Sequence, residues 1–162
     1  MIEQEFVTYS ADKLEQLAGR IQDCLGRLSE EQIWTRKTDN ENAVGNIVLH
    51  LAGNARQWIC HAVGGHTDVR HRDAEFAARS GSSVAETLRA AVADAVGVIR
   101  GLDLSDLATM TKVQGFELTK GIAIYHVVEH FAGHTGQIIF ATKLLTGQDL
   151  GYYKDLRAVA IP

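Results

Sequence analysis

The chain has 162 residues, of which 46% are hydrophobic and 22% are charged. This balance is typical of one soluble globular domain and excludes an intrinsically disordered protein. The formal net charge of −4 gives no basic surface of the kind that binds nucleic acid. We therefore expect a single domain that covers residues 1–162 and has no nucleic-acid partner.

Three sequence features bear on the cellular compartment. No run approaches the ~18 apolar residues that a membrane span requires, so we expect no membrane partner. Residues 1–6 show no basic region followed by an apolar stretch, which argues against a signal peptide. The two cysteines, Cys24 and Cys60, are too few for a disulfide framework and favour a reducing compartment. We expect a cytoplasmic protein.

Long helices dominate the predicted structure. The single proline is Pro162, so no internal proline interrupts a helix. Apolar residues recur at spacings of three and four, which predicts amphipathic helices. Ser10 is the predicted start of the first helix, and Ser83 with Glu86 fits a capping box at the start of the third. The predicted helices cover residues 10–28, 42–63, 83–102 and 120–145.

The connecting segments differ in character. Residues 29–32 predict a short capped turn, and residues 66–83 are charged and contain glycine, with one predicted helical turn at 74–78. Residues 107–119 alternate polar and apolar side chains around Gln114-Gly115, which predicts a small hairpin. The tail, with Tyr152, Tyr153 and Leu156, should pack on the helices. Four long helices in one domain predict an all-α four-helix bundle.

Three of the seven histidines share one face of the last predicted helix. His126, His130 and His134 are four residues apart, which places them on one stripe with a drift of about 40° per step. The stripe runs beside Val127 and Phe131, so it should face the other helices. Two histidines at positions i and i+4 can hold one metal ion from a single helix face.

His50 is the candidate third ligand. It lies at the margin of the apolar face of the second predicted helix, where its imidazole could reach a neighbouring helix. Three imidazoles with an open position are the arrangement with which zinc enzymes activate water or polarise a ligand. Alternatively, His50 is a histidine at the core edge with one hydrogen-bond partner, and the His130/His134 spacing arises by chance. His126 could be a fourth ligand, a group that supports a ligand, or a solvated side chain.

Polar residues one turn away from these histidines could support the site. Gln137 follows His134 and could bind a ligand or a metal-bound water, or make a structural hydrogen bond. Asn46 and Asn54 flank His50 and could orient its imidazole through the second ring nitrogen. Solvated helix surface is the alternative for both asparagines.

Two of these stretches resemble known motifs. Residues 125–139 (YHVVEHFAGHTGQII) resemble the last-helix motif of the DinB-like superfamily, in which a His-x-x-x-His pair precedes Gly-Gln-Ile. Residues 45–54 (GNIVLHLAGN) are similar to its second-helix motif, which contains the first metal-binding histidine. The segments 53–59, 72–76 and 143–147 further resemble one DinB-like subfamily of undetermined function.

The resemblance implies an antiparallel four-helix bundle with a long crossover, often dimeric, and a metal ion held by His50, His130 and His134. Some members are thiol-dependent enzymes that use mycothiol, bacillithiol or glutathione in transfer or isomerisation. We therefore expect a homodimer with one divalent ion (zinc, nickel or iron), a small-molecule substrate and a low-molecular-weight thiol. A metal-dependent hydrolase and a non-catalytic metal- or ligand-binding protein are the alternatives.

Overall fold

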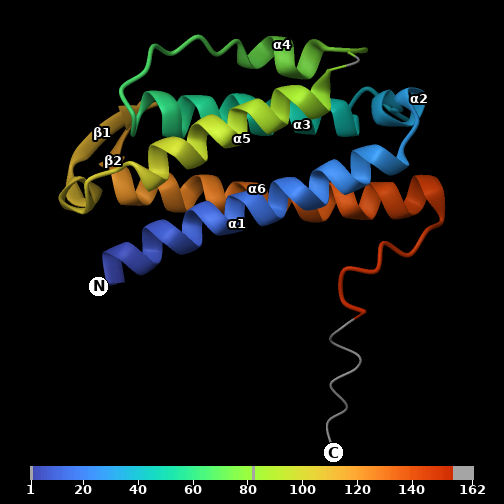
Figure 1. Ribbon diagram of the computed structural model, residues 1–162. Coiled ribbons are helices and arrows are strands. Elements are labelled where there is room, and N and C mark those ends of the chain that lie inside the picture. The colour runs from blue at the N-terminus through green and yellow to red at the C-terminus, as the bar shows by residue number, and fades with distance from the viewer. Residues whose placement is uncertain (1, 82, 155–162) are drawn as a thin grey trace, which may run out of the picture.

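The computed structural model describes residues 2–81 and 83–154, and they are mostly helical (Figure 1). The helical segments are α1 (Ile2–Arg27), α2 (Glu30–Trp34), α3 (Val44–Ala55), the π-helix η1 (Arg56–His61), α4 (Arg72–Ala77), α5 (Val84–Arg100), the 3-10 helix η2 (Leu104–Ala108) and α6 (Lys120–Thr146). The predicted hairpin is a two-stranded antiparallel sheet of β1 (Met110–Val113) and β2 (Phe116–Thr119). The prediction of a mostly helical fold is confirmed.

The long helices surround one apolar core. Helix α1 packs on α5 and α6, and α3 packs on the same two helices. Each of them contributes a large side chain that is fully buried, namely Leu14, Leu51, Leu88 and Phe131. These side chains belong to the stripes of apolar residues that predicted the helices, because a helix with one apolar face must bury it against a neighbour.

The direction of the helices differs from a strictly antiparallel arrangement. Figure 1 shows α1 and α6 running one way and α3 and α5 running the other way. Helices α3 and α5 are parallel because residues 62–81, which include α4, carry the chain back along the molecule before α5 begins. We call this segment the crossover.

Some predicted boundaries were wrong. Helix α1 begins at Ile2 and not near Ser10, because Ser10 is 4% exposed and packs within the helix. Ser83 makes no side-chain hydrogen bond as the N-cap of α5, so the predicted capping box there is wrong. The capped turn is confirmed, since Ser29 and Gln32 form a capping box at α2.

The tail packs partly as predicted. The Tyr152 hydroxyl donates a hydrogen bond to Asp23 of α1 at 2.8 Å, whereas the Tyr153 side chain is exposed. Leu156 lies outside the described residues. Among the described residues, none of the helices has the length and apolar character that a membrane crossing needs.

Candidate metal centre

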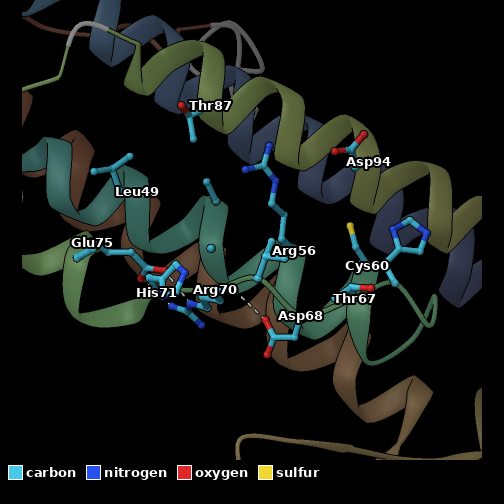
Figure 2. A pocket seen from close by; sticks show the side chains of 15 residues that line it. Leu49, Arg56, Cys60, Thr67, Asp68, Arg70, His71, Glu75, Thr87 and Asp94 are labelled. Carbon is cyan, nitrogen blue, oxygen red and sulfur yellow. Dashed lines mark hydrogen bonds and ion pairs between the residues drawn. The ribbon is translucent and has the colours of Figure 1, made fainter.

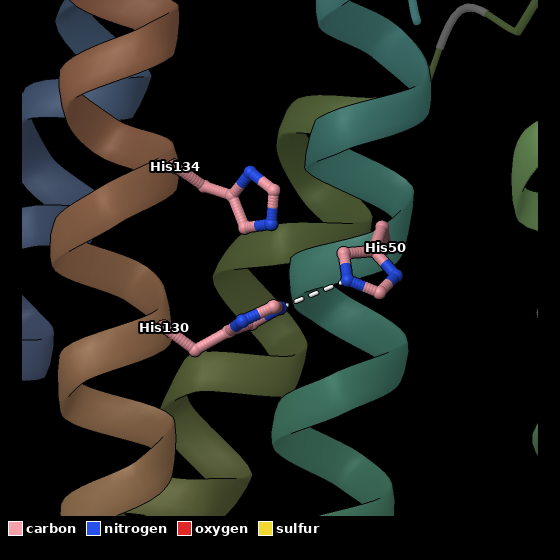
Figure 3. A group of neighbouring side chains, drawn as sticks. All are labelled: His50, His130 and His134. Carbon is pink, nitrogen blue, oxygen red and sulfur yellow. Dashed lines mark hydrogen bonds between the residues drawn. The ribbon is translucent and has the colours of Figure 1, made fainter.

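Three histidines from two helices meet in the structure. His50 of α3 faces His130 and His134 of α6 (Figure 3), and one ring nitrogen of each lies within 4.8 Å of the others. The Nε2 atoms of His50 and His130 are 2.8 Å apart. Among the described residues, no further histidine, cysteine or carboxylate belongs to this cluster. The structure therefore brings together the three candidate metal ligands.

Helix geometry and core packing orient the pair on α6. The rings of His130 and His134 meet edge to face, with centroids 4.5 Å apart, because successive turns carry both side chains on one face. Val127 and Phe131 beside them are fully buried. Since these two side chains fix the rotation of α6 about its axis, the histidines must point toward α3.

The second nitrogen of His50 contacts a carboxylate from the crossover. His50 Nδ1 lies 3.2 Å from Oε2 of Glu75 in α4. Arg70 holds both oxygens of that carboxylate, with Nε 2.7 Å from Oε1 and Nη2 2.8 Å from Oε2. Its remaining nitrogen, Nη1, donates to Gln57. A carboxylate that accepts the Nδ1 hydrogen leaves the Nε2 lone pair of His50 available for a metal ion.

Glu75 is buried, yet it stays charged. Burial by itself raises the pKa of Glu75, but hydrogen bonds from Arg70 and His50 outweigh burial and hold the pKa below its usual value. The carboxylate also needs space, because a Cβ at position 53 would overlap it. Gly53 therefore lets the crossover approach α3 closely enough for Glu75 to reach His50.

The two candidate ligands on α6, His130 and His134, are neutral at neutral pH. Burial, followed by the neighbouring histidines His134 and His50, lowers the pKa of His130 to about 4. Burial also lowers the pKa of His134, although its hydrogen bond to Gln137 opposes this effect. Neutral imidazole is the form that binds a metal ion, so the protonation states suit a metal site.

Gln137 and His126 contact the cluster in different ways. Gln137 Oε1 lies 2.7 Å from Nδ1 of His134, so it orients this imidazole. His126 lies outside the ligand cluster. Its ring packs on Trp58 with centroids 3.9 Å apart and stacks on His130 at 5.6 Å. These contacts support a role for His126 beside the ligands, and they do not support the reading of His126 as a fourth ligand.

The two asparagines have other surroundings than we expected. Asn46 donates to the backbone carbonyls of Glu75 and Ala78 at 2.8 and 2.9 Å, so it fastens the crossover to α3. Asn54 is 3% exposed, and its Oδ1 has no hydrogen-bond partner among the described residues. The residue that contacts the second ring nitrogen of His50 is therefore Glu75 and not an asparagine. No spacing in the sequence had connected Glu75 with His50.

Two cavities adjoin this cluster. A cavity of about 350 Å³ is bordered by His50, His130 and the hairpin side chain Phe116; we call it the histidine cavity. A cavity of about 450 Å³ lies between α3, α5 and the crossover, with Arg56 and residues of α5 in its walls (Figure 2). Arg70 borders both cavities. The histidine cavity leaves open space beside the imidazoles of His50 and His130.

Comparison with known proteins agrees with this architecture. Residues 1–157 match the family model described as "Protein of unknown function (DUF1572)". The chain belongs to this family. No curated protein matches the chain.

Solved structures identify the fold. The chain is similar to a conserved protein from Enterococcus faecalis, with a TM-score of 0.70, 14% identity and coverage of 87% of this chain and 97% of that one. It is also similar to a DinB-like protein from Bacillus cereus, with a TM-score of 0.64, 18% identity and coverage of 80% and 85%. The fold is therefore DinB-like, as the sequence resemblance predicted.

Proposed function

We propose that this DUF1572 protein is a metal-dependent enzyme that acts on a small molecule and holds one divalent ion through His50, His130 and His134. The observation that carries this proposal is the convergence of three imidazole nitrogens from two helices, within 4.8 Å of one another. Two of these imidazoles, those of His50 and His130, border a cavity. Three imidazoles suit zinc, nickel or iron, and availability decides among them.

The surrounding residues prepare the imidazoles for an ion. Glu75 contacts Nδ1 of His50 and orients its ring, and Gln137 contacts Nδ1 of His134 and orients that ring. A divalent ion held in this way polarises a ligand and lowers the pKa of a bound water or thiol. Trp58 and His126 pack on each other and border the same cavity as His50 and His130.

The number of protein ligands favours catalysis over a structural role. Structural zinc sites are closed by four protein ligands, whereas catalytic sites use three and keep one position open. The described residues offer three ligands, since His126 does not join the cluster. A non-catalytic metal-binding protein is therefore the weaker alternative.

A low-molecular-weight thiol is our proposed co-substrate, in a transfer or isomerisation reaction. The sequence resemblance is the main support for it. Among the described residues that border the histidine cavity, none is acidic, so the cavity can accept a thiolate without charge repulsion. Hydrolysis by metal-activated water is the alternative reaction.

The proposed architecture is a four-helix bundle with a long crossover, assembled as a homodimer. Helix α6 exposes Ile122, Tyr125, Phe140 and Leu144, each at least 55% accessible. Large exposed apolar side chains on one helix favour association. Light scattering at roughly tens of micromolar protein should give the mass of two chains, and the mass of one chain would contradict the dimer.

Both cysteines are free, in keeping with a cytoplasmic location.

The proposed function is tested on full-length protein purified without a histidine tag. Elemental analysis should find about one divalent ion per chain, and thiol-transfer and ester-hydrolysis assays should show activity that a chelator removes. Because the apolar core stabilises the fold independently of the metal, the chelated protein and His50→Ala should remain helical by circular dichroism and unfold cooperatively. Unfolding on chelation would show a structural ion and contradict the proposed enzyme.

A further inference from the structure

The walls of the histidine cavity are largely apolar and aromatic. Besides the histidines, they include Trp58 of η1, Phe116 and Leu118 of β2, and Ile122 of α6. The volume of about 350 Å³ lies at the lower end of the range for small-molecule sites. The cavity therefore suits a ligand with a single ring more than an extended one.

One wall of the cavity is a set of flat rings. The indole of Trp58 lies 3.9 Å from the His126 ring and 6.2 Å from the Phe116 ring, with interplanar angles of 31° and 39°. Trp58 is buried, whereas Phe116 is 59% and Ile122 55% exposed. A planar apolar group in the cavity would cover these exposed side chains and pack against the rings.

The charge of the cavity is positive and comes from Arg72. Arg70 also borders the cavity, but the Glu75 carboxylate already neutralises it. The Arg72 guanidinium lies over the ring of Phe76, 5.0 Å from its centroid. Since no acidic side chain is among the described residues that border the cavity, Arg72 is available to an anionic group of a ligand.

A buried polar group completes the cavity. Asn54 borders it and is 3% exposed, and its Oδ1 has no hydrogen-bond partner among the described residues. Buried side-chain amides are normally paired. A ligand that donates one hydrogen bond would satisfy this oxygen.

We propose that the substrate of this site is a small aryl acid, in which one ring packs against Trp58 and Phe116 and a carboxylate pairs with Arg72. This inference rests on the proposed metal enzyme, because the reacting end of the substrate is the end that faces His50 and His130. Arg72 and Phe116 then select the substrate, and neither of them belongs to the ligand cluster.

The test compares three hydroxamates on the zinc-loaded full-length protein by isothermal titration calorimetry. Acetohydroxamate binds zinc alone, benzohydroxamate adds a ring, and 4-carboxybenzohydroxamate adds a carboxylate at the far end. The ring should tighten binding at least about tenfold, and the carboxylate should add about fivefold. Equal affinities for the three probes would overturn the inference.

Substitutions test which residue is responsible for each gain in binding affinity. Arg72→Gln should remove the gain from the carboxylate and keep the gain from the ring, whereas Phe116→Ala should reduce the gain from the ring. Arg89→Gln is the matched control, because Arg89 is an exposed arginine on α5 and should change neither gain. Persistence of the full carboxylate gain in Arg72→Gln would overturn the assignment.

A second measurement separates this inference from the metal site. Bound zinc is determined in the same samples, and its absence would contradict the proposed function. Metal-free protein is then titrated with benzenesulfonate and methanesulfonate, which need no zinc. Tighter binding of benzenesulfonate that depends on Arg72 is expected, and equal binding of the two sulfonates would overturn the inference by itself.

Discussion

The candidate site joins two regions of different character. Helices α3 and α6 are regular and contribute the three histidines, whose positions follow from helix periodicity and buried neighbours. The crossover has one short helix, α4, and many exposed residues, yet it contributes the carboxylate that contacts His50. The regular helices thus provide the candidate ligands, and the irregular segment orients one of them.

The crossover can position this carboxylate because hydrogen bonds fasten it to α3 and to the loop that follows α2. Asn46 and Arg36 donate hydrogen bonds to the backbone carbonyl of Phe76 and its neighbours. Arg70, whose side chain is 3% exposed, holds the carboxylate of Glu75. An exposed segment can therefore position a buried group when its own polar contacts are satisfied by a rigid neighbour.

Removal of both ligands on α6 should have the largest effect. His130→Ala combined with His134→Ala leaves one imidazole, so the purified protein should lose its divalent ion, as measured by elemental analysis. His66→Ala is the control, because His66 is exposed and lies outside the cluster. Full metal content in the double variant would contradict the assignment of the ligands.

Loss of the crossover carboxylate should weaken the site without abolishing it. Glu75→Gln keeps the shape of the side chain and removes the charge that holds His50 and Arg70, so zinc affinity should fall about 10- to 100-fold. The free energy of unfolding should fall by about 1–3 kcal/mol. Calorimetry and urea denaturation measure the two effects.

The matched control for this substitution is Glu117→Gln, because Glu117 is an exposed carboxylate paired with Lys112 at 3.7 Å. It should change neither quantity beyond about 0.5 kcal/mol. If Glu75→Gln binds zinc as tightly as the parent protein does, the crossover does not orient His50.

The substitution Gly53→Ala should change zinc affinity and the free energy of unfolding to different extents. The Cβ of Gly53→Ala displaces the Glu75 carboxylate, so zinc affinity should fall about tenfold. Alanine also favours the helix by about 1 kcal/mol, which offsets part of the lost contact. Gly19→Ala is the control, since a Cβ there meets no atom within 4 Å; it should raise the free energy of unfolding and leave zinc affinity unchanged. A parallel loss of affinity in both variants would contradict the steric explanation.

The pH dependence of the metal-free protein should show the smallest effect. Burial lowers the pKa of His130 from 6.5 to about 4, so the unfolded chain binds more protons than the folded chain between these values. The free energy of unfolding should therefore fall as the pH drops from about 6.5 to 4. Because the imidazole is partly solvated, we expect about 1–2 kcal/mol.

Urea denaturation with chelator present measures this dependence in the parent protein and in His130→Gln. The variant cannot titrate at this position, so its stability should depend less on pH across the same interval. Identical pH profiles would show that His130 does not titrate with a lowered pKa.

The sequence by itself determined the parts that depend on local periodicity. The apolar spacing identified the long helices, and the four-residue spacing placed His130 and His134 on one face of α6. The motif around His50 identified the third candidate ligand on α3. The helices and the common face of His130 and His134 were predictable because a helix fixes the relative directions of side chains three and four positions apart, whatever surrounds it.

The tertiary structure alone decided how the site is supported. Glu75 lies 25 positions from His50 in the chain, in a segment without periodicity. The need for glycine at position 53 is visible only in the folded chain, where the Glu75 carboxylate occupies the space that a Cβ would take. The packing of His126 on Trp58 likewise joins two different helices. Contacts of this kind depend on how separate elements dock, and docking is set by the summed packing of the whole core and not by any local pattern.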